Sequence, residues 1–341
     1  MVIFAIETSC DDTSVSISRN DKILANLTAN QAIHEMYGGV VPELASRDHQ
    51  KNIVPVSIEA LKQSGIQWNE IDAIAFTEGP GLIGSLLVGA SFAKSIAQAL
   101  SKPLIGVHHM QAHILANFIE KETTNAPMEA GKPEFPFICL TVSGGHTQLV
   151  LVNDYFSFVV LGETKDDAAG EAFDKAAKLL GLPYPGGPYL DKLAMSGDPL
   201  KIRFSKSNIP DFDFSFSGIK TSLLYFLQDE LKKNHNYIKE NIHDICASYQ
   251  KNVVDCLLEK LKKAIEKTKV KSFALAGGVS ANSELRRRAL KLGKEMNCKV
   301  HIPLLEHCTD NAAMIAVTAY YKYLQGNFSE LNTVPKARWD L

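Results

Sequence analysis

Three histidines fall within ten mostly apolar residues, VHHMQAHILA, at positions 107–116. On a helix, His109 and His113 are one turn apart and share a face, whereas His108 projects about 140° away from His113. Two imidazoles one turn apart can bind a single metal ion, as in the helices of zinc peptidases. A zinc peptidase has glutamate directly after the first histidine, and Met110 in that place cannot transfer a proton. The pair is therefore either packed in a core or part of a metal site with another chemistry.

The composition is that of a globular protein with two domains. A chain of 341 residues is long for one core, and 45% hydrophobic with 22% charged residues is ordinary. The net charge of −2 means that contact with nucleic acid needs a local basic patch. Six cysteines without CxxC spacing predict reduced thiols and a cytoplasmic location. The N-terminus lacks the basic segment of a signal peptide, and the apolar stretch 82–100 predicts a buried helix, so we expect no membrane contact.

A strand–turn–strand pattern occurs twice, which predicts a duplicated α/β architecture. The first copy is VIFAI (2–6) with TSVSIS (13–18), and the second is FICLTV (137–142) with HTQLVLV (146–152). A further strand is expected at 272–278, and helices are expected at 43–64, 84–100, 167–180, 217–232, 243–267 and 282–294, with a last helix from Asn311 to Gly326. The Pro- and Gly-rich segment 121–136 predicts a linker. We therefore expect an N-terminal lobe at 1–130, a C-terminal lobe at 131–309, and residues 310–341 packing back on the first lobe.

Four polar or glycine-rich segments could contact a ligand, and each also has a structural explanation. VSGGHTQ (142–148) could direct backbone N–H groups at phosphate oxygens or be an ordinary hairpin. AGGVSANSELR (276–286) could hold a nucleotide at a helix start or simply cap that helix. ETSCDDTS (7–14) could bind Mg²⁺ or polar groups or form Asx turns. The charged side chains of the segment 165–181 could form a solvated helix face. The PGGP turn that follows this segment is, however, unusual for a simple connector.

Strings spread over nearly the whole chain together resemble the tRNA threonylcarbamoyladenosine synthesis family, whose bacterial catalytic members are called TsaD. The family has the actin, sugar-kinase and heat-shock-ATPase (ASKHA) fold: two α/β lobes with a nucleotide cleft between them. The strings are ETSCDDTSV at 7–15, YGGVVPELASRDH at 37–49, EGPGLIGSLLVG at 78–89, HHMQAH at 108–113, SGGHTQL at 143–149, DDAAGEAFDKAAKLLGLPYPGGP at 166–188, FSFSGIKT at 214–221, GGVSANSELR at 277–286 and CTDNAAMIA at 308–316.

The resemblance implies a metal site and a substrate site. It implies that His109, His113 and Asp310 bind one divalent ion, Fe²⁺ or Zn²⁺; two imidazoles and a carboxylate are independently a sensible ligand set for either ion. Asp310 could instead, or also, cap the last helix. The residues implied to bind the nucleotide and substrate are Thr141, Val142, Ser143, Gly144, Gly145, Asp174, Gly187, Asp191 and Asn282, with Asp174 and Asp191 at the ribose. Ser9, Asp11 and Asp12 are implied to line the cleft as catalytic residues, and Mg²⁺ could accompany the nucleotide.

The implied reaction transfers a threonylcarbamoyl group from threonylcarbamoyl-AMP to the exocyclic N6 amine of the adenosine 3′ of the anticodon, position 37, in tRNAs that read ANN codons. AMP is released. The family implies a TsaB-like paralogue and a TsaE-like ATPase as partners. Residues that could contact tRNA are basic, although the arginine run could equally be a solvated helix face; they are Lys201, Arg203, Lys206, Lys220, Arg286–Arg288, Lys291 and Lys294.

Two other functions share this fold. A metal-dependent O- or S-carbamoyltransferase also has a histidine-rich helix, but DDAAGEAFDK and GGVSANSELR favour the tRNA enzyme. A scaffold subunit without catalytic activity would lack the metal helix and the terminal aspartate, and this chain has both.

Overall fold

The computed structural model describes residues 1–120, 131–205 and 209–341. The chain forms two compact units, one of Met1–Lys132 with Pro303–Leu341 and one of Pro133–Ile302. Residues 121–130 of the expected linker lie outside the described residues. The segment that rejoins the first unit begins at Pro303, seven residues before the position expected from the sequence.

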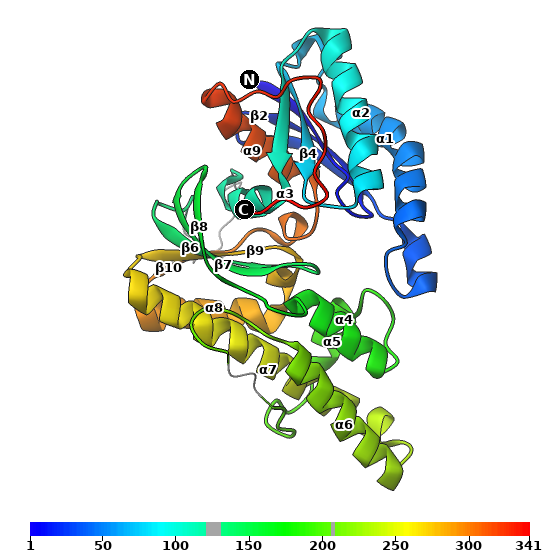
Figure 1. Cartoon of the computed structure of the whole chain (residues 1–341), viewed down its shortest axis with the longest axis vertical. Coiled ribbons are helices and arrows are strands. Elements are labelled where there is room, and N and C mark those ends of the chain that lie inside the picture. The colour runs from blue at the N-terminus through cyan, green and yellow to red at the C-terminus, as the bar shows by residue number, and fades with distance from the viewer. Residues whose placement is uncertain (121–130, 206–208) are drawn as a thin grey trace. The chain divides into compact units, whose positions relative to one another are not determined.

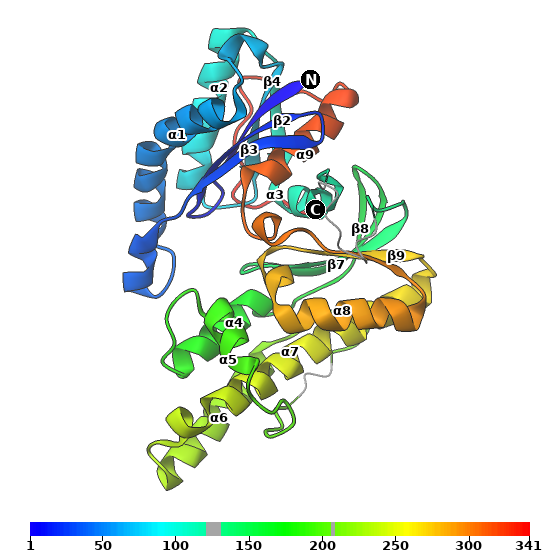
Figure 2. The ribbon, with the colours of Figure 1, turned by 180° about the vertical axis from the view of Figure 1, so that it is seen from behind.

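The first unit is a five-stranded sheet covered on both faces by helices. Its strands occur in the order β3-β2-β1-β4-β5. One face is covered by α1 and α2 and the other by α9, as both views show (Figures 1 and 2). Phe4, Ile74 and Phe76 are fully buried in the core of this unit. The elements are β1 (Val2–Glu7), β2 (Thr13–Arg19), β3 (Lys22–Ala29), α1 (Pro42–Ser64), β4 (Ala73–Gly79), α2 (Ile83–Leu100), β5 (Leu104–His108), α3 (His109–Leu115) and α9 (Ala312–Leu324).

The second unit contains a five-stranded sheet in the order β10-β9-β6-β7-β8, together with helices α4 to α8. Its core joins residues of the sheet, such as Leu140 and Phe273, to Tyr249 on the long helix α7. The elements are β6 (Phe137–Val142), β7 (Thr147–Asp154), β8 (Ser157–Glu163), α4 (Ala169–Leu179), α5 (Gly186–Ala194), α6 (Ser217–Lys233), α7 (Tyr237–Thr268), β9 (Ser272–Ala276), α8 (Ser283–Met296) and β10 (Lys299–His301).

The two sheets have the same topology. In each, the first strand pairs antiparallel with the second and parallel with the fourth, and the second strand pairs antiparallel with the third. The fourth strand pairs parallel with the fifth. The order β3-β2-β1-β4-β5 is thus repeated by β8-β7-β6-β9-β10. This repetition confirms the duplicated α/β architecture that the sequence predicts.

Most of the predicted helices and strands are confirmed within a few residues of their expected ends. The helix predicted at 243–267 starts earlier in the structure, because α7 begins at Tyr237. The backbone of α7 is non-helical at Asn241, just before the predicted start. Among the described residues, only α2 is long and apolar enough to span a membrane by length and composition, a test that core helices also pass. One face of α2 is buried, including Leu86, Ala90 and Ala93, and it packs against β4 and α1.

The turn between β9 and α8 requires glycine at its first position. Gly277 has φ +83°, and a Cβ there would lie 2.4 Å from the carbonyl oxygen of Val142 at the end of β6. The backbones of the two central strands therefore approach each other where both turns begin.

The substitution Gly277→Ala should lower the free energy of unfolding by about 1–3 kcal/mol, because alanine is strained at this φ and its Cβ overlaps Val142. Gly218→Ala is the matched control: no atom lies within 4 Å of a Cβ there, and the residue lies in α6. Urea unfolding of both variants measures the difference. Equal stability of the two variants would contradict the close approach.

Candidate metal centre and nucleotide-binding residues

Two helix ends bring two imidazoles and a carboxylate together in the first unit. Nε2 of His113 lies 3.1 Å from Oδ1 of Asp310, and Nε2 of His109 lies 3.5 Å from the same oxygen. One ligand atom of each residue lies within 4.8 Å of the others. Asp310 does not cap α9; the side chain of Asn311 does, by accepting from the backbone N–H of Met314. The carboxylate of Asp310 is therefore available to a metal ion.

Glu7 fixes the ring of His109 from the opposite side. Its Oε2 lies 3.2 Å from His109 Nδ1 and accepts a hydrogen bond from Thr77, while its Oε1 accepts from the backbone N–H of Ser9. Glu7 is fully buried at the end of β1. A carboxylate that receives Nδ1–H leaves Nε2 of the same ring to bind a metal ion. The sequence analysis predicted that the segment 7–14, which begins with Glu7, could bind Mg²⁺ or polar groups, but it did not predict the contact of Glu7 with His109.

Burial and charge act on His109 in opposite directions. Burial lowers the pKa of this imidazole, but Asp310 and Glu7 outweigh burial and raise the pKa to about 10. Burial raises the pKa of Asp310, but His109 and His113 bring it well below the ordinary value. Burial also raises the pKa of Glu7, but the charge and hydrogen bond of His109 outweigh burial and lower this pKa. The two carboxylates therefore favour positive charge at His109, which a proton or a coordinated cation can supply.

His108 positions the helix that holds both histidines. Its Nδ1 accepts from the backbone N–H of Met110 at 3.1 Å and so caps α3. Its Nε2 lies 3.2 Å from the carbonyl oxygen of Trp339, and the two rings are 4.7 Å apart. The Nζ atom of Lys336 lies over the ring of Trp339, 3.8 Å from its centroid. His108 thus contacts the segment around Trp339 and does not join the ligand pair.

The turn 7–12 is held by a histidine from α1. His49 lies 2.8 Å from the hydroxyl of Thr13 and 2.9 Å from the carbonyl oxygen of Cys10. Ser9, predicted to be catalytic, is buried with Oγ 3.2 Å from His109 Nδ1. Burial raises the pKa of the Cys10 thiol, so it is a poor nucleophile.

Asp11 and Asp12 follow Cys10 in the same turn, and both are partly buried. Burial, with the charges of Asp11, Asp310 and Glu7, raises the pKa of Asp12 to about 7. A carboxyl group that titrates near neutral pH can exchange a proton with a reacting group.

The glycine turn of the second unit exposes its backbone. The backbone N–H of Ser143 donates to the carbonyl oxygen of His146 at 2.8 Å, and this hydrogen bond closes the turn. Gly144 and Gly145 are exposed, and nothing lies within 4 Å of a Cβ at either position. This turn can therefore approach an anion closely. Thr141 and Val142 lie in β6 with buried side chains, so only their backbone could contact a ligand.

Asp174 links α4 to the beginning of α5. Its Oδ1 accepts from the backbone N–H groups of Gly186 at 2.8 Å and Gly187 at 3.3 Å. A Cβ at Gly186 would overlap Ala177, so the PGGP turn packs directly on α4. Burial raises the pKa of Asp174 above its ordinary value. The turn and the aspartate therefore form one structural element.

Asp191 and Asn282, predicted from widely separated strings, are in contact. Nδ2 of Asn282 donates to Oδ1 of Asp191 at 3.2 Å, and Ser283 donates to both oxygens of the carboxylate. Asn282 also caps α8 by accepting from the backbone N–H of Leu285 at 2.9 Å. One asparagine thus fixes the start of α8 and the orientation of Asp191.

Several of the basic residues predicted to contact tRNA are paired within the protein. Arg287 pairs with Glu284 and Arg288 pairs with Asp255. Lys206 lies outside the described residues. Arg287 is exposed, whereas Arg288 pairs with the buried Asp255, so the arginine run is only in part a solvated helix face.

Comparison with known proteins identifies the family. The sequence model of the tRNA N6-adenosine threonylcarbamoyltransferase (TsaD) family matches residues 22–317. The tRNA N6-adenosine threonylcarbamoyltransferase of Riemerella anatipestifer is 55% identical over 340 residues, which cover 100% of this chain and 98% of the relative. That of Porphyromonas gingivalis is 52% identical, with 99% and 98% coverage. The chain belongs to the tRNA N6-adenosine threonylcarbamoyltransferase family. It is therefore a member of a family of tRNA-modifying acyltransferases.

Solved structures show the fold. HypF of T. kodakarensis has a TM-score of 0.61 at 14% identity, covering 98% of this chain and 49% of the HypF chain. The ROK hexokinase of Thermus thermophilus has a TM-score of 0.51 at 13% identity, covering 96% of this chain and 100% of the hexokinase. These likenesses confirm the predicted ASKHA fold.

The donors of the first unit fit a divalent ion. Two neutral imidazole nitrogens and one carboxylate oxygen leave coordination positions for other ligands and suit Fe²⁺ or Zn²⁺ equally.

The substitution Glu7→Gln should weaken Zn²⁺ binding about 10- to 100-fold, because the charge that orients His109 and raises its basicity is removed while side-chain volume is kept. Competition with a chromophoric chelator measures the affinity. Glu43→Gln, at an exposed ion pair on α1, is the control. Unchanged Zn²⁺ affinity in a folded Glu7→Gln variant would show that Glu7 does not tune the metal ligand.

Proposed function

We propose that this chain transfers the threonylcarbamoyl group from threonylcarbamoyl-AMP to the N6 amine of adenosine 37 in tRNAs that read ANN codons, releasing AMP. The observation that carries the proposal is the convergence of His109, His113 and Asp310 in a member of the tRNA N6-adenosine threonylcarbamoyltransferase family. The acyl group of the adenylate is already activated, since AMP is a good leaving group. The adenosine amine is a weak nucleophile, so alignment and charge stabilisation are what the protein must provide.

The first unit provides the charged part of the proposed site. An Fe²⁺ or Zn²⁺ ion bound by His109, His113 and Asp310 would supply a Lewis acid for the developing negative charge of the acyl and phosphate oxygens. Glu7 and Ser9 hold the ring of His109, which keeps Nε2 directed at Asp310. Asp12 is the proposed proton acceptor, because its pKa of about 7 allows both protonation states at neutral pH.

The second unit provides the proposed adenylate site. The backbone of Ser143, Gly144 and Gly145 would receive phosphate oxygens, with Mg²⁺ as a possible companion of the nucleotide. Asp174, Gly187, Asp191 and Asn282 would hold the adenosine part, with a carboxylate accepting from the ribose hydroxyls.

Partners and location follow from the same proposal. The tRNA is the acceptor substrate, and a TsaB-like paralogue and a TsaE-like ATPase are the proposed protein partners. A cytoplasmic location fits a tRNA substrate and thiols that are not oxidised: all six cysteines lie in the described part of the chain, and none forms a disulfide.

A metal-dependent carbamoyltransferase acting on another acceptor is the second candidate, because a histidine-rich metal helix on this fold is compatible with it. The 55% identity over the whole chain favours the tRNA enzyme over this fold-level likeness at 14% identity. Purified protein supplied with labelled threonylcarbamoyl-AMP and either tRNA or small-molecule acceptors separates the two. Label in tRNA with release of AMP supports the proposal, and label only in another acceptor contradicts it.

The substitution His109→Ala should abolish metal binding and reduce transfer to tRNA by at least about 100-fold, because one of three donors is lost. Metal analysis of anaerobically purified protein and a single-turnover transfer assay measure the two effects. His235→Ala, at an exposed histidine beyond α6, is the control. Full transfer by a metal-free variant would contradict the proposed chemistry.

The transfer rate should depend on pH through Asp12. A base must be deprotonated, so kcat/KM should rise as pH increases through the pKa of Asp12, which is about 7. A bound cation would bring this apparent pKa somewhat below 7, because positive charge favours the carboxylate. In Asp12→Asn this rise should be absent and the rate about 10²- to 10⁴-fold lower. Asp48→Asn, at an ion pair on α1, should keep the wild-type profile. An Asp12→Asn variant with the wild-type pH profile would exclude Asp12 as the base.

A further inference from the structure

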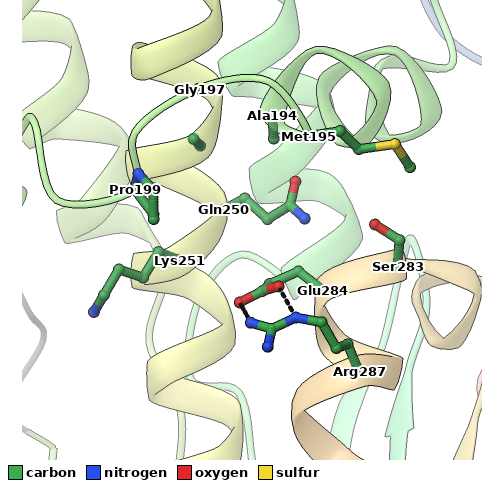
Figure 3. A pocket seen from close by; sticks show the side chains of 10 residues that line it. Ala194, Met195, Gly197, Pro199, Gln250, Lys251, Ser283, Glu284 and Arg287 are labelled. Atoms are coloured by element: carbon green, nitrogen blue, oxygen red, sulfur yellow. Dashed lines mark hydrogen bonds and ion pairs between the residues drawn. The ribbon is translucent and has the colours of Figure 1, made fainter.

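We infer that Gln250 of α7 is a positioning residue that orients Asp191 and Asn282 for the adenosine part of the substrate. This inference rests on the proposed function of those two residues. Gln250 lines a cavity of about 370 Å³ bounded by α5, α7 and the start of α8. Figure 3 shows its side chain in this pocket, with the amide nitrogen on the side of Ser283.

The amide of Gln250 joins the two residues in one hydrogen-bond network. Its Nε2 donates to Oδ1 of Asp191 at 2.8 Å and to Oδ1 of Asn282 at 3.4 Å. The Oδ1 atom of Asp191 also accepts from Asn282 Nδ2 at 3.2 Å and Ser283 Oγ at 2.7 Å. Its Oδ2 accepts one bond, from the backbone N–H of Ser283 at 3.1 Å. Oδ1 is thus occupied by protein donors, and Oδ2 keeps the capacity to accept from a ligand hydroxyl.

Stability does not explain a glutamine at this position. Gln250 is only 3% exposed, and its Oε1 is buried without a hydrogen-bond partner among the described residues. A buried polar atom without a partner is destabilising, and an apolar side chain of similar shape avoids that cost. Without Gln250, Oδ1 of Asp191 would still accept from Asn282 and Ser283. The loss would be that of the donor on α7 that links α5 to the start of α8 and fixes the rotation of the Asp191 and Asn282 side chains.

The substitution Gln250→Met tests this role because methionine has a similar length and donates no hydrogen bond. We expect AMP affinity, measured by calorimetry, to fall about tenfold, because binding must then fix the side chains of Asp191 and Asn282, at a cost of roughly 0.5–1.5 kcal/mol for each side chain. The KM for threonylcarbamoyl-AMP should rise with a smaller change in kcat. Stability in urea should be unchanged or increased. Gln250→Glu should bind AMP more weakly still, because it places a second carboxylate against Asp191.

Lys251→Met is the matched control on the same helix. In Figure 3 its side chain points away from Ser283, and its Nζ lies 2.6 Å from Asp255. This variant should bind AMP within about twofold of the wild type, because Lys251 bonds to Asp255 and not to Asp191 or Asn282, and Asp255 keeps its ion pair with Arg288. Wild-type AMP affinity in Gln250→Met, or an affinity loss that follows an equal loss of stability, would overturn the positioning role. If the wild-type protein itself fails to bind AMP, the proposed adenylate site is wrong and the inference falls with it.

Discussion

A histidine held between the fully buried Glu7 and the partly exposed Asp310 is the interaction on which the candidate site depends. His109 lies between Glu7 and Asp310, which come from the end of β1 and from the residues just before α9. A buried charge that loses its partner costs roughly 3–5 kcal/mol, so these three residues constrain one another. The helix α3, the first strand and the segment that returns from Pro303 must therefore meet at this point. The site and the packing of the first unit are consequences of the same electrostatic arrangement.

The duplicated topology gives the two units different chemistry at equivalent places. The end of β1 and the turn after it carry Glu7 and Ser9, whose side chains are buried and reach His109. The turn after β6 carries Gly144 and Gly145, whose backbone is exposed. Side-chain donors suit a cation, and exposed backbone N–H groups suit an anion. The same strand–turn–strand unit therefore holds the proposed metal ligand His109 in one copy and forms a proposed phosphate site in the other.

Local patterns in the sequence were sufficient for the architecture and indicated the histidine pair as one of two interpretations, whereas the other proposed site residues came from the resemblance to a known family. The helical spacing of His109 and His113 and the repeated strand–turn–strand pattern are both short-range signals. Glu7, His49 and Gln250 could not be predicted in the same way, because their roles arise from contacts with distant residues. Glu7 meets His109 across 102 positions, and Gln250 meets Asp191 across 59. Asp310 had two possible roles from sequence, and only the placement of Asn311 as the cap separates them.

X-ray absorption spectroscopy of the anaerobically purified, metal-loaded protein tests the central claim most directly. The account predicts one ion with two imidazole nitrogens and at least one carboxylate oxygen at about 2.0–2.2 Å, and no sulfur in the first shell. Replacing Asp310 by asparagine should change this shell while the two imidazole contributions remain. A sulfur neighbour at about 2.3 Å, or a shell with fewer than two imidazoles, would place the ion elsewhere and contradict the arrangement around His109.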